Sequence, residues 1–460
     1  MIREKLLSSK ERLSGAGARV LETPIGWHVV RFRDLFDFGK GLNITKENLQ
    51  PSGVPCVNYG EVHSKYGFEV TPRKHELQCV SEDYLKKFPR SLLNKGDFVF
   101  ADTSEDIEGS GNFTQLVSDD TVFAGYHTVI CRPTGDNDSR YLAYLLDSES
   151  YRSQIRTAVK GVKVYSITKS ILKNTKVWFP KVQDQQYISK FLDKQTTQID
   201  EAIAIKEQQI ALLKERKQII IQKAVTQGLD PNVPMKDSGV DWIGDIPEHW
   251  EVVRFKNLFS QSRLPVQKDD GVVTSYRDGQ VTLRSNRRLD GYTEAIIEGG
   301  YQGIRKGQLV LNSMDAFEGA IGVSESDGKC TPEYVICYPN REGISQYYFA
   351  YLLREMALAK YIQVICNAVR QRAVRIRYNN LASRFMVVPP ESEQEEIVKF
   401  IAVEKINTDD GIAHLQSQIE KLKEYKTTLI NSAVTGKIKI TAEMAGLCYN
   451  AQDVEEAPAE

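Results

Sequence analysis

One long segment with a helical pattern occurs twice in this chain of 460 residues, and both copies have the same length. Gln185 matches Gln394, and Ile203 matches Ile412, with one shared offset, 394 − 185 = 412 − 203 = 209. One inserted residue would rotate every later side chain of a helix by about 100°, so a repeat without gaps indicates that helix length matters here. The chain is therefore predicted to contain two copies of one unit, each ending in a long helix.

Each long helix follows a lobe, and the two lobes also share short matching sequences. "IGWHVVRFRDLF" (25–36) parallels "EHWEVVRFKNLF" (248–259), "LNKGDFVFAD" (93–102) parallels "IRKGQLVLNS" (304–313), and "YLAYLL" (141–146) parallels "YFAYLL" (348–353). The second pair predicts a turn that leads into a strand, and the third predicts the start of a short helix. Each lobe is therefore expected to mix helices and strands. Trp27 and Trp250 are 250 − 27 = 223 positions apart, so the first lobe is longer by 223 − 209 = 14 residues.

The predicted fold class is α+β, with two globular lobes joined and separated by a long antiparallel pair of helices in a pseudo-two-fold repeat. The predicted segments are a leader at 1–22, a first lobe at 23–180, a long helix at 181–228, a linker at 229–245, a second lobe at 246–390, a second long helix at 391–440 and an acidic tail at 441–460.

Apolar residues at steps of three, four and seven form one seam along each long helix. The seam residues are Ile199, Ile203, Ile210, Leu213 and Ile220 in the first helix and Ile412, Leu415, Ile419, Leu422 and Leu429 in the second. The two seams can bury each other in an antiparallel coiled coil, and 27 residues from 199 to 225 would span about 40 Å. The alternative is that each helix only covers its own lobe.

Composition limits the possible chemistry. No apolar stretch is long enough to span a membrane, and the start is too polar for a secretory signal, so a cytoplasmic location is expected. Seven cysteines form no C-x-x-C pair, six histidines lack metal spacing, and no phosphate-binding loop is present, so no metal and no catalytic residue are predicted. The acidic segment 104–109 is interpreted as a solvated loop rather than a magnesium site, and His249 as a packing or hydrogen-bonding residue.

Positive charge gathers at corresponding places, although the formal net charge of the chain is −1. Residues 140–176 hold eight Lys/Arg against two Asp/Glu, and residues 354–384 hold seven against one, so each segment has a balance of +6. Arginine can bind guanine with two parallel hydrogen bonds, and lysine can bind phosphate. The candidate DNA-binding residues are Lys160, Lys163, Tyr165 and Lys169 in the first half and Arg277, Arg284, Arg287, Arg288, Arg370, Arg372, Arg375 and Arg377 in the second. The alternative is an ordinary solvated surface.

Several phrases carry a resemblance to a known family. Parts of the chain resemble the specificity subunit (HsdS, S subunit) of type I restriction-modification systems. The matching sequences are "DQQYISKFLDKQTTQID" (184–200), "DSGVDWIGDIPEHWEV" (237–252) and "EQEEIVKFI" (393–401), together with the two repeated helical segments. The resemblance covers nearly the whole chain. It implies two target recognition domains, each reading one half of a bipartite sequence in double-stranded DNA, and a helical rod that sets the spacing of the halves.

The same resemblance implies partners that carry the chemistry. Two methyltransferase (M) subunits with S-adenosylmethionine would dock on the rod and methylate adenine at N6, and two restriction (R) subunits with ATP and magnesium would join the full complex. This chain would bind no cofactor and would catalyse nothing. A competing hypothesis is a coiled-coil scaffold whose lobes bind proteins. A self-sufficient nuclease or methylase is disfavoured because the sequence holds no catalytic motif.

Overall fold

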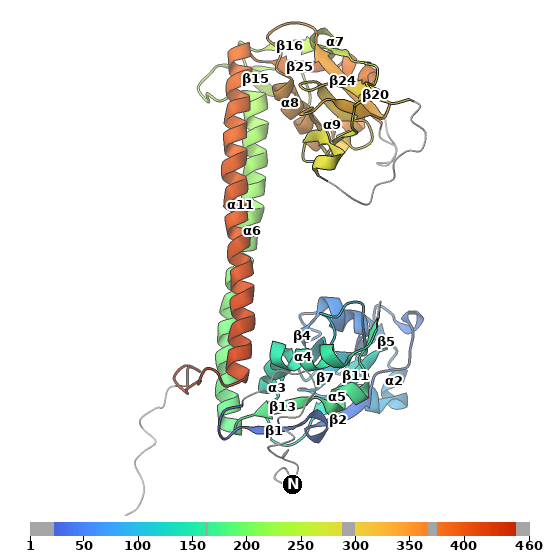
Figure 1. Ribbon diagram of the computed structural model, residues 1–460, viewed down its shortest axis with the longest axis vertical. Helices are drawn as coiled ribbons and strands as arrows, with labels where there is room; N and C mark the ends of the chain where they lie inside the picture. Colours follow the sequence, from blue (N-terminus) through green and yellow to red (C-terminus); the bar gives the residue numbers. More distant parts are fainter. Residues whose placement is uncertain (1–22, 162–163, 288–299, 367–374, 448–460) are drawn as a thin grey trace, which may run out of the picture. The chain divides into compact units, whose positions relative to one another are not determined.

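The computed structural model describes residues 23–161, 164–287, 300–366 and 375–447 (Figure 1). The chain divides into two compact units. The first unit contains the residues up to 205 and those from 417 onward, and the second contains residues 206–416. The first unit is therefore built from two separate stretches of chain, whereas the second is a single stretch.

The first unit contains a five-stranded sheet in the order β2-β11-β7-β9-β4. Its strands are β2 (Phe36–Lys40), β11 (Thr128–Pro133), β7 (Phe98–Ala101), β9 (Phe113–Leu116) and β4 (Phe68–Val70), and β1 (His28–Arg31) pairs with β13 (Lys176–Phe179). A second sheet, β5-β3-β10-β6, contains β5 (Cys79–Val80), β3 (Val54–Val57), β10 (Val122–Ala124) and β6 (Leu92–Leu93), and β8 (Thr103–Ser104) pairs with β12 (Tyr165–Ser166). The helices are α2 (Asp83–Lys87), α3 (Ser139–Asp147), α4 (Glu149–Ala158) and α5 (Lys169–Asn174).

The second unit contains a four-stranded sheet in the order β17-β24-β21-β22. Its strands are β17 (Phe259–Gln261), β24 (Tyr334–Pro339), β21 (Leu309–Asn312) and β22 (Ile321–Val323). The other described strands of this unit form antiparallel pairs: β16 (Glu251–Arg254) with β25 (Phe385–Val388), β14 (Met235–Asp237) with β15 (Asp245–Pro247), β18 (Val273–Ser275) with β19 (Val281–Leu283), and β20 (Gln302–Ile304) with β23 (Gly328–Cys330). The helices are α7 (Phe255–Leu258), α8 (Gln346–Leu358), α9 (Tyr361–Ile365) and α10 (Tyr378–Ala382).

The two sheets share one topology, because β2-β11-β7-β9 has the same order and pairing as β17-β24-β21-β22. The register also matches, with Phe36 opposite Pro133 in the first unit and Phe259 opposite Pro339 in the second. The strands predicted after the two Lys-Gly turns are β7 and β21, and the predicted short helices are α3 and α8. The prediction of two related α+β lobes is therefore confirmed.

A buried tyrosine fixes each short helix in the same way. Asp138 caps α3 and Ser345 caps α8 by accepting a hydrogen bond from a main-chain N–H of the first turn. The Tyr141 hydroxyl donates to the carbonyls of Trp178 (3.1 Å) and Val434 (3.5 Å). In the second unit, the Tyr348 hydroxyl reaches the carbonyls of Val225 (2.8 Å) and Val387 (3.5 Å). Each tyrosine therefore ties the last strand of its lobe to the end of a long helix.

The long helices are α6 (Val182–Gln227, 46 residues) and α11 (Glu391–Val434, 44 residues). The first agrees with the predicted 181–228, but the predicted end of the second at residue 440 is wrong. Gly436 adopts φ +70°, its N–H donates to the Ala433 carbonyl, and the Lys437 N–H donates to the Ser432 carbonyl at 2.9 Å. These two bonds form a Schellman cap, which stops the helix six residues early.

Each long helix contributes one half to each unit, so neither helix serves its own lobe alone. In the first unit, the Lys426 ammonium lies 2.7 Å from the Asp200 carboxylate, and in the second unit Lys217 lies 2.5 Å from Asp409. These ion pairs are the same pair repeated, because 426 − 217 = 409 − 200 = 209. Within each unit, half of α6 therefore lies beside half of α11.

All ten predicted seam residues lie at buried or half-buried positions. Ile199, Ile203, Leu422 and Leu429 join the apolar core of the first unit. In the second unit, Leu213 lies 3.9 Å from the point where a Cβ on Gly411 would stand. A coiled-coil spacer that runs through both units remains a prediction.

Candidate nucleic-acid interface

The exit loop of β21, defined as residues 312–320, collects the predicted DNA-binding segments of the second unit. The Ser313 N–H donates to the Glu333 carbonyl at 2.9 Å, which brings in the turn before β24. The Ile376 N–H donates to the Ser313 carbonyl at 3.2 Å, which brings in the basic segment before α10. Loops that are far apart in sequence therefore meet at one edge of the sheet.

Arg277 reaches the exit loop from the tip of the β18-β19 hairpin. Its Nη2 lies 3.0 Å from Asp315 Oδ1, and its Nε lies 2.5 Å from Glu318 Oε2. The hydrogen bond to Asp315 raises the pKa of Arg277 further above its usual range. On the other side of the loop, Arg375 Nε lies 3.8 Å from Glu333 Oε2. Carboxylates therefore hold both arginines.

The other arginines of the hairpin have separate roles. The Arg287 guanidinium lies 4.1 Å from the Tyr276 ring centre and forms a 2.8 Å ion pair with Asp278, so it packs on the hairpin itself. Arg284 is half-buried, and its Nε donates to Thr274 Oγ1 at 3.3 Å. Arg377 is exposed and precedes α10, where its main-chain N–H donates to Asn380 Oδ1 at 2.9 Å. Four further candidates, Lys163, Arg288, Arg370 and Arg372, lie outside the described residues.

The first unit repeats the main-chain frame of this loop. The Asp102 N–H donates to the His127 carbonyl (3.1 Å), and the Ile167 N–H donates to the Asp102 carbonyl (2.8 Å). Asp102 therefore corresponds to Ser313, and His127 corresponds to Glu333. His127 Nδ1 lies 3.2 Å from Asp102 Oδ1, and His127 adopts φ +56°, a left-handed conformation that is uncommon outside glycine.

Sequence reasoning missed the aromatic residues around this loop. His63 Nε2 lies 3.0 Å from Ser104 Oγ, and the Tyr59 hydroxyl donates to Glu105 at 3.1 Å. Partial burial and the hydrogen bond to Glu105 raise the pKa of Tyr59 above its usual value. Matching the strands of the two lobes would have revealed position 127, because the turns before β11 and β24 are then equivalent.

The predicted basic residues of the first unit lie in different surroundings. Tyr165 lies on β12 opposite Ser104, two residues after Asp102 in the exit loop of β7, which is the first-unit counterpart of the exit loop of β21, and Lys160 is exposed. Lys169 begins α5 and is half-buried, and its pKa is lowered first by burial and then by the charges of Lys173 and Lys40. Tyr165 therefore joins the loop, whereas Lys169 belongs with other lysines near β2.

The acidic segment 104–109 folds back on itself. Asp106 Oδ1 accepts a hydrogen bond from the Gly109 N–H at 2.5 Å, and Ser104 Oγ donates to the Asp106 carbonyl at 2.7 Å. Within the described parts of the chain, no group of three His, Cys, Asp or Glu side chains is arranged to hold a metal ion. The Asp106 carboxylate is therefore used to close a turn within this segment.

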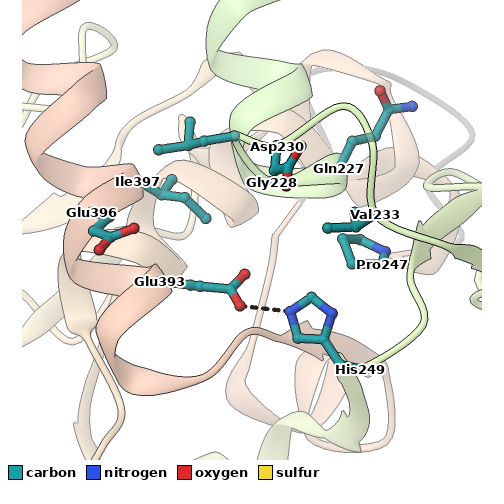
Figure 2. Close-up of a pocket in the computed structure, with 10 residues that line it drawn as sticks. Gln227, Gly228, Asp230, Val233, Pro247, His249, Glu393, Glu396 and Ile397 are labelled. Carbon is teal, nitrogen blue, oxygen red and sulfur yellow. Dashed lines mark hydrogen bonds and ion pairs between the residues drawn. The ribbon is translucent and has the colours of Figure 1, made fainter.

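A cavity of about 270 Å³ lies in the second unit, where the end of α6 meets the start of α11 (Figure 2). His249 Nε2 lies 2.5 Å from Glu393 Oε1, and the other oxygen of this carboxylate accepts from Trp250 Nε1 at 2.9 Å. Gly228 adopts φ +78°, and a Cβ there would stand 3.3 Å from the Trp250 ring. His249 therefore has the hydrogen-bonding role predicted for it, at the junction between lobe and helix.

None of the described helices is both long and apolar enough to cross a membrane.

Comparison with known proteins first defines a class. Residues 24–215 match the family model described as the type I restriction modification DNA specificity domain. A type I restriction enzyme specificity subunit of Methanocaldococcus jannaschii, MjaX, is 23% identical over 441 residues, which cover 91% of this chain and 95% of the relative. The match therefore extends through both repeats.

Solved structures share the fold. A chain from a structural study of complex assembly and conformational transition in a type I R-M system has a TM-score of 0.65 at 14% identity, covering 91% of this chain and 100% of the other. The HsdS subunit from Thermoanaerobacter tengcongensis has a TM-score of 0.50 at 15% identity, with coverages of 90% and 98%. Over nearly its whole length the chain is therefore similar to specificity subunits of type I restriction-modification systems, and residues 24–215 match their DNA specificity domain.

Proposed function

We propose that this chain is the DNA-reading subunit of a type I restriction-modification complex, and that each lobe reads one half of a bipartite target. The observation that carries the proposal is the repeated exit loop, with Asp102 in one unit and Ser313 in the other held by equivalent main-chain bonds. Two copies of one frame with different side chains suit two different half-sites. The comparisons give no support to the alternative of a protein-binding scaffold.

The long helices act as the ruler in this proposal. Gap-free repetition of the helical phrase and the repeated pairs Asp200–Lys426 and Asp409–Lys217 support a spacer of fixed length. Four extra residues lengthen a helix by about 6 Å, and one base pair rises about 3.4 Å, so the half-sites should move apart by one or two base pairs.

The test inserts Ala-Ala-Lys-Ala after Ala211 in α6 and after Glu420 in α11, which are equivalent positions, 420 − 211 = 209. Methylome sequencing of cells that express the chain with its methyltransferase subunit then gives the split motif. We expect unchanged half-sites with a spacing longer by one or two base pairs. The same four residues inserted after Asn232, in the turn before β14, are the control and should leave the spacing unchanged. A lengthened chain that keeps the original spacing would refute the ruler.

Exposed apolar side chains on the helices are the proposed docking surface for methyltransferase subunits. In the second unit, Leu212 and Ile219 are 56% and 44% exposed and seven residues apart on α6, and Val403 and Ile406 are 55% and 61% exposed on α11. Such residues on a polar helix suit a protein partner. The proposal assigns S-adenosylmethionine and methyl transfer to that partner, and ATP, magnesium and cleavage to restriction subunits, so this chain reads without catalysing.

Co-purification tests the docking surface. The double variant Leu212→Glu/Ile219→Glu should retain less than a tenth of the methyltransferase subunit, because two charges would be buried against it. Gln222→Glu, at another exposed position of α6, is the matched control and should retain it. Full retention by the double variant would place the docking surface elsewhere.

A further inference from the structure

We propose that Arg277 reads a guanine in the half-site bound by the second unit, and that Asp315, Glu318 and Arg354 are positioning residues that hold it in the reading geometry. The inference rests on the proposed function and adds the base and the residue that recognises it. All four residues belong to the second unit.

The hydrogen bonds of Arg277 occupy one edge of its guanidinium group. Nε faces Glu318, and Nη2 faces Asp315. A guanidinium carries five N–H groups in a planar fork, so the edge formed by Nη1 and the second hydrogen of Nη2 keeps two parallel donors. The side chain is 64% exposed, which leaves that edge accessible to a ligand. Guanine presents two neighbouring acceptors, O6 and N7, in the major groove, and paired arginine donors match them.

The two carboxylates favour a base over a phosphate. The guanidinium groups of Arg277 and Arg354 balance the carboxylates of Asp315 and Glu318, so the cluster has no net positive charge to attract a phosphate, whereas hydrogen bonding to an uncharged base edge remains intact. A contribution to folding stability explains this group of charges less well, because exposed ion pairs of this kind add little to the free energy of unfolding. The main effect of the two carboxylates is therefore to hold the exposed Arg277 side chain in one orientation.

The carboxylates are themselves held in place. Asn312, at the end of β21, is 7% exposed, and its Nδ2 donates to Asp315 Oδ2 at 3.3 Å. The Asp315 N–H donates to the Asn312 carbonyl at 3.1 Å. The position of Arg277 is therefore transmitted from the sheet through Asn312 and Asp315.

The main chain under Arg277 is clamped from the opposite side by α8. Arg354 donates through Nη2 to the Arg277 carbonyl at 3.4 Å and through Nη1 to the Asp278 carbonyl. Gly279 has φ +89°, and a Cβ there would collide with the Arg354 guanidinium. Gly319 has φ +96°, and a Cβ there would stand 2.9 Å from the Arg277 carbonyl oxygen. The hairpin tip can approach this closely only because both positions are glycine.

The clamp matters for recognition because a long side chain usually loses rotamer freedom when it binds. Arg277 is already held at its guanidinium and at its main chain, so binding a base requires little further ordering. Arg287 instead packs on Tyr276 and pairs with Asp278 within its own hairpin. Arg277 is therefore an exposed arginine that is well prepared to discriminate between bases.

The experiment selects bound sequences from a random duplex pool, with the full chain co-purified with its methyltransferase subunit. Wild type should yield a split motif that contains a guanine whose selection depends on Arg277. Arg277→Ala should lower the preference for that one G·C pair by roughly 10- to 100-fold, the range of one bidentate base contact, and leave the other positions unchanged. Arg277→Lys should lose the preference as well, because an ammonium lacks the planar fork.

A second variant tests the positioning residues. Asp315→Asn/Glu318→Gln keeps Arg277 but removes its negatively charged partners. We expect a partial loss of the guanine preference, roughly 3- to 10-fold, together with tighter binding to unrelated DNA, because the local charge becomes positive. Arg341→Ala is the matched control, since Arg341 is an exposed arginine of the same unit paired with Glu251 at 3.5 Å, and it should leave the motif unchanged.

Four outcomes separate the possibilities. Loss of one guanine in Arg277→Ala supports the inference. Arg277→Ala could instead lower the affinity equally for all sequences and reduce the slope of log K against log salt concentration by about one. That result would make Arg277 a phosphate contact and overturn the inference. A lower melting temperature with an unchanged motif would also overturn it. Failure of the wild type to select any split motif would count against the proposed function itself.

Discussion

The two units build the same loop from the same main-chain bonds, yet they fill it with different chemistry. In the first unit, His127 faces Asp102, whereas in the second unit Glu333 faces Arg375. Main-chain bonds fix the loop without constraining its side chains, as Ile167 and Ile376 show by making the same N–H bond in both units. The exposed side chains of this loop can therefore change while its main-chain hydrogen bonds stay the same.

The units also differ beyond the shared sheet. The first unit has a four-stranded sheet, β5-β3-β10-β6, where the second has the two-stranded pairs β18-β19 and β20-β23. In the second unit, the β18-β19 hairpin carries Arg277 to the exit loop. Variation is therefore concentrated in the parts that surround the loop, whereas the contacts with the long helices are repeated.

The largest expected effect comes from removing the tryptophans that anchor each lobe to a helix. Trp178 and Trp250 are each 1% exposed, and their Nε1 groups donate to the Val434 carbonyl and the Glu393 carboxylate. Trp178→Ala and Trp250→Ala should each cost about 3–5 kcal/mol of unfolding free energy. Hydrogen exchange should report lost protection in the unit that carries the change and retained protection in the other. Equal loss in both units by both variants would show that they unfold together.

A pH effect should distinguish the second unit from the first. Glu355 is buried, and burial raises its pKa to about 7 although Gln218 Nε2 donates to both of its oxygens at 2.6 and 2.7 Å and Arg354 opposes the shift. The folded state therefore keeps a proton that the unfolded state loses near pH 4.5. Stability should decline as pH rises from about 4.5 to about 7, by on the order of 3 kcal/mol, and then level off.

The variant Glu355→Gln should remove this decline and stabilise the protein at pH 8, because an amide stays uncharged and can still accept from Gln218. Denaturant unfolding at pH 4.5, 6 and 8 measures it. Ser148→Ala, at the corresponding position of the first unit, is the control and should leave the pH profile unchanged. A wild-type decline that persists in Glu355→Gln would assign the titration to another group.

The two buried tyrosine hydroxyls test how closely the anchors correspond. Tyr141→Phe and Tyr348→Phe should each cost about 1 kcal/mol, because each removes one hydroxyl that joins a strand carbonyl to a helix carbonyl. The shorter bond of Tyr348 to the helix, 2.8 Å against 3.5 Å for Tyr141, predicts the larger loss in the second unit. Urea unfolding of both variants measures the difference, and a larger loss for Tyr141→Phe would contradict the ranking.

The smallest effect concerns the repeated ion pairs between the helices. Double-mutant cycles on Asp200/Lys426 and Asp409/Lys217 should give coupling energies of about 0.2–1 kcal/mol, because all four groups are partly exposed. The two energies should be similar and should shrink together in 1 M salt. Coupling in only one pair would show that the helix halves are not equivalent.

The repeat made most of the fold predictable. A fixed offset between matching words predicted both lobes and both long helices, because helix periodicity and turn signals are local properties of the sequence. The early end of α11 was missed because a cap depends on the conformation of Gly436, which "VTGKIKI" does not reveal. The exit loops were missed because His127 and Asp102 become neighbours only through strand pairing.

The candidate site was predictable only in outline. The sequence drew attention to Arg277 and Arg375 by charge, but the carboxylates that hold them, such as Asp315, come from other segments of the chain. Lys169 shows the opposite failure, since its half-buried place beside Lys173 and Lys40 could not be inferred from spacing. A run of positive charges in the sequence indicates a binding surface. The orientation of each side chain on that surface depends on tertiary contacts, which the sequence does not show.

The division of the first unit between two distant stretches has a consequence for synthesis on the ribosome. Its core includes Leu429 and Val434, which emerge after the whole of the second unit has been translated. Residues 206–416 are contiguous and can complete their core while the last helix is still being made. The usual order, in which the amino-terminal domain matures first, is therefore reversed. A nascent chain whose residues up to about 416 have left the ribosome, with the rest still inside it, should resist protease in its later-made portion and remain sensitive in its earlier one.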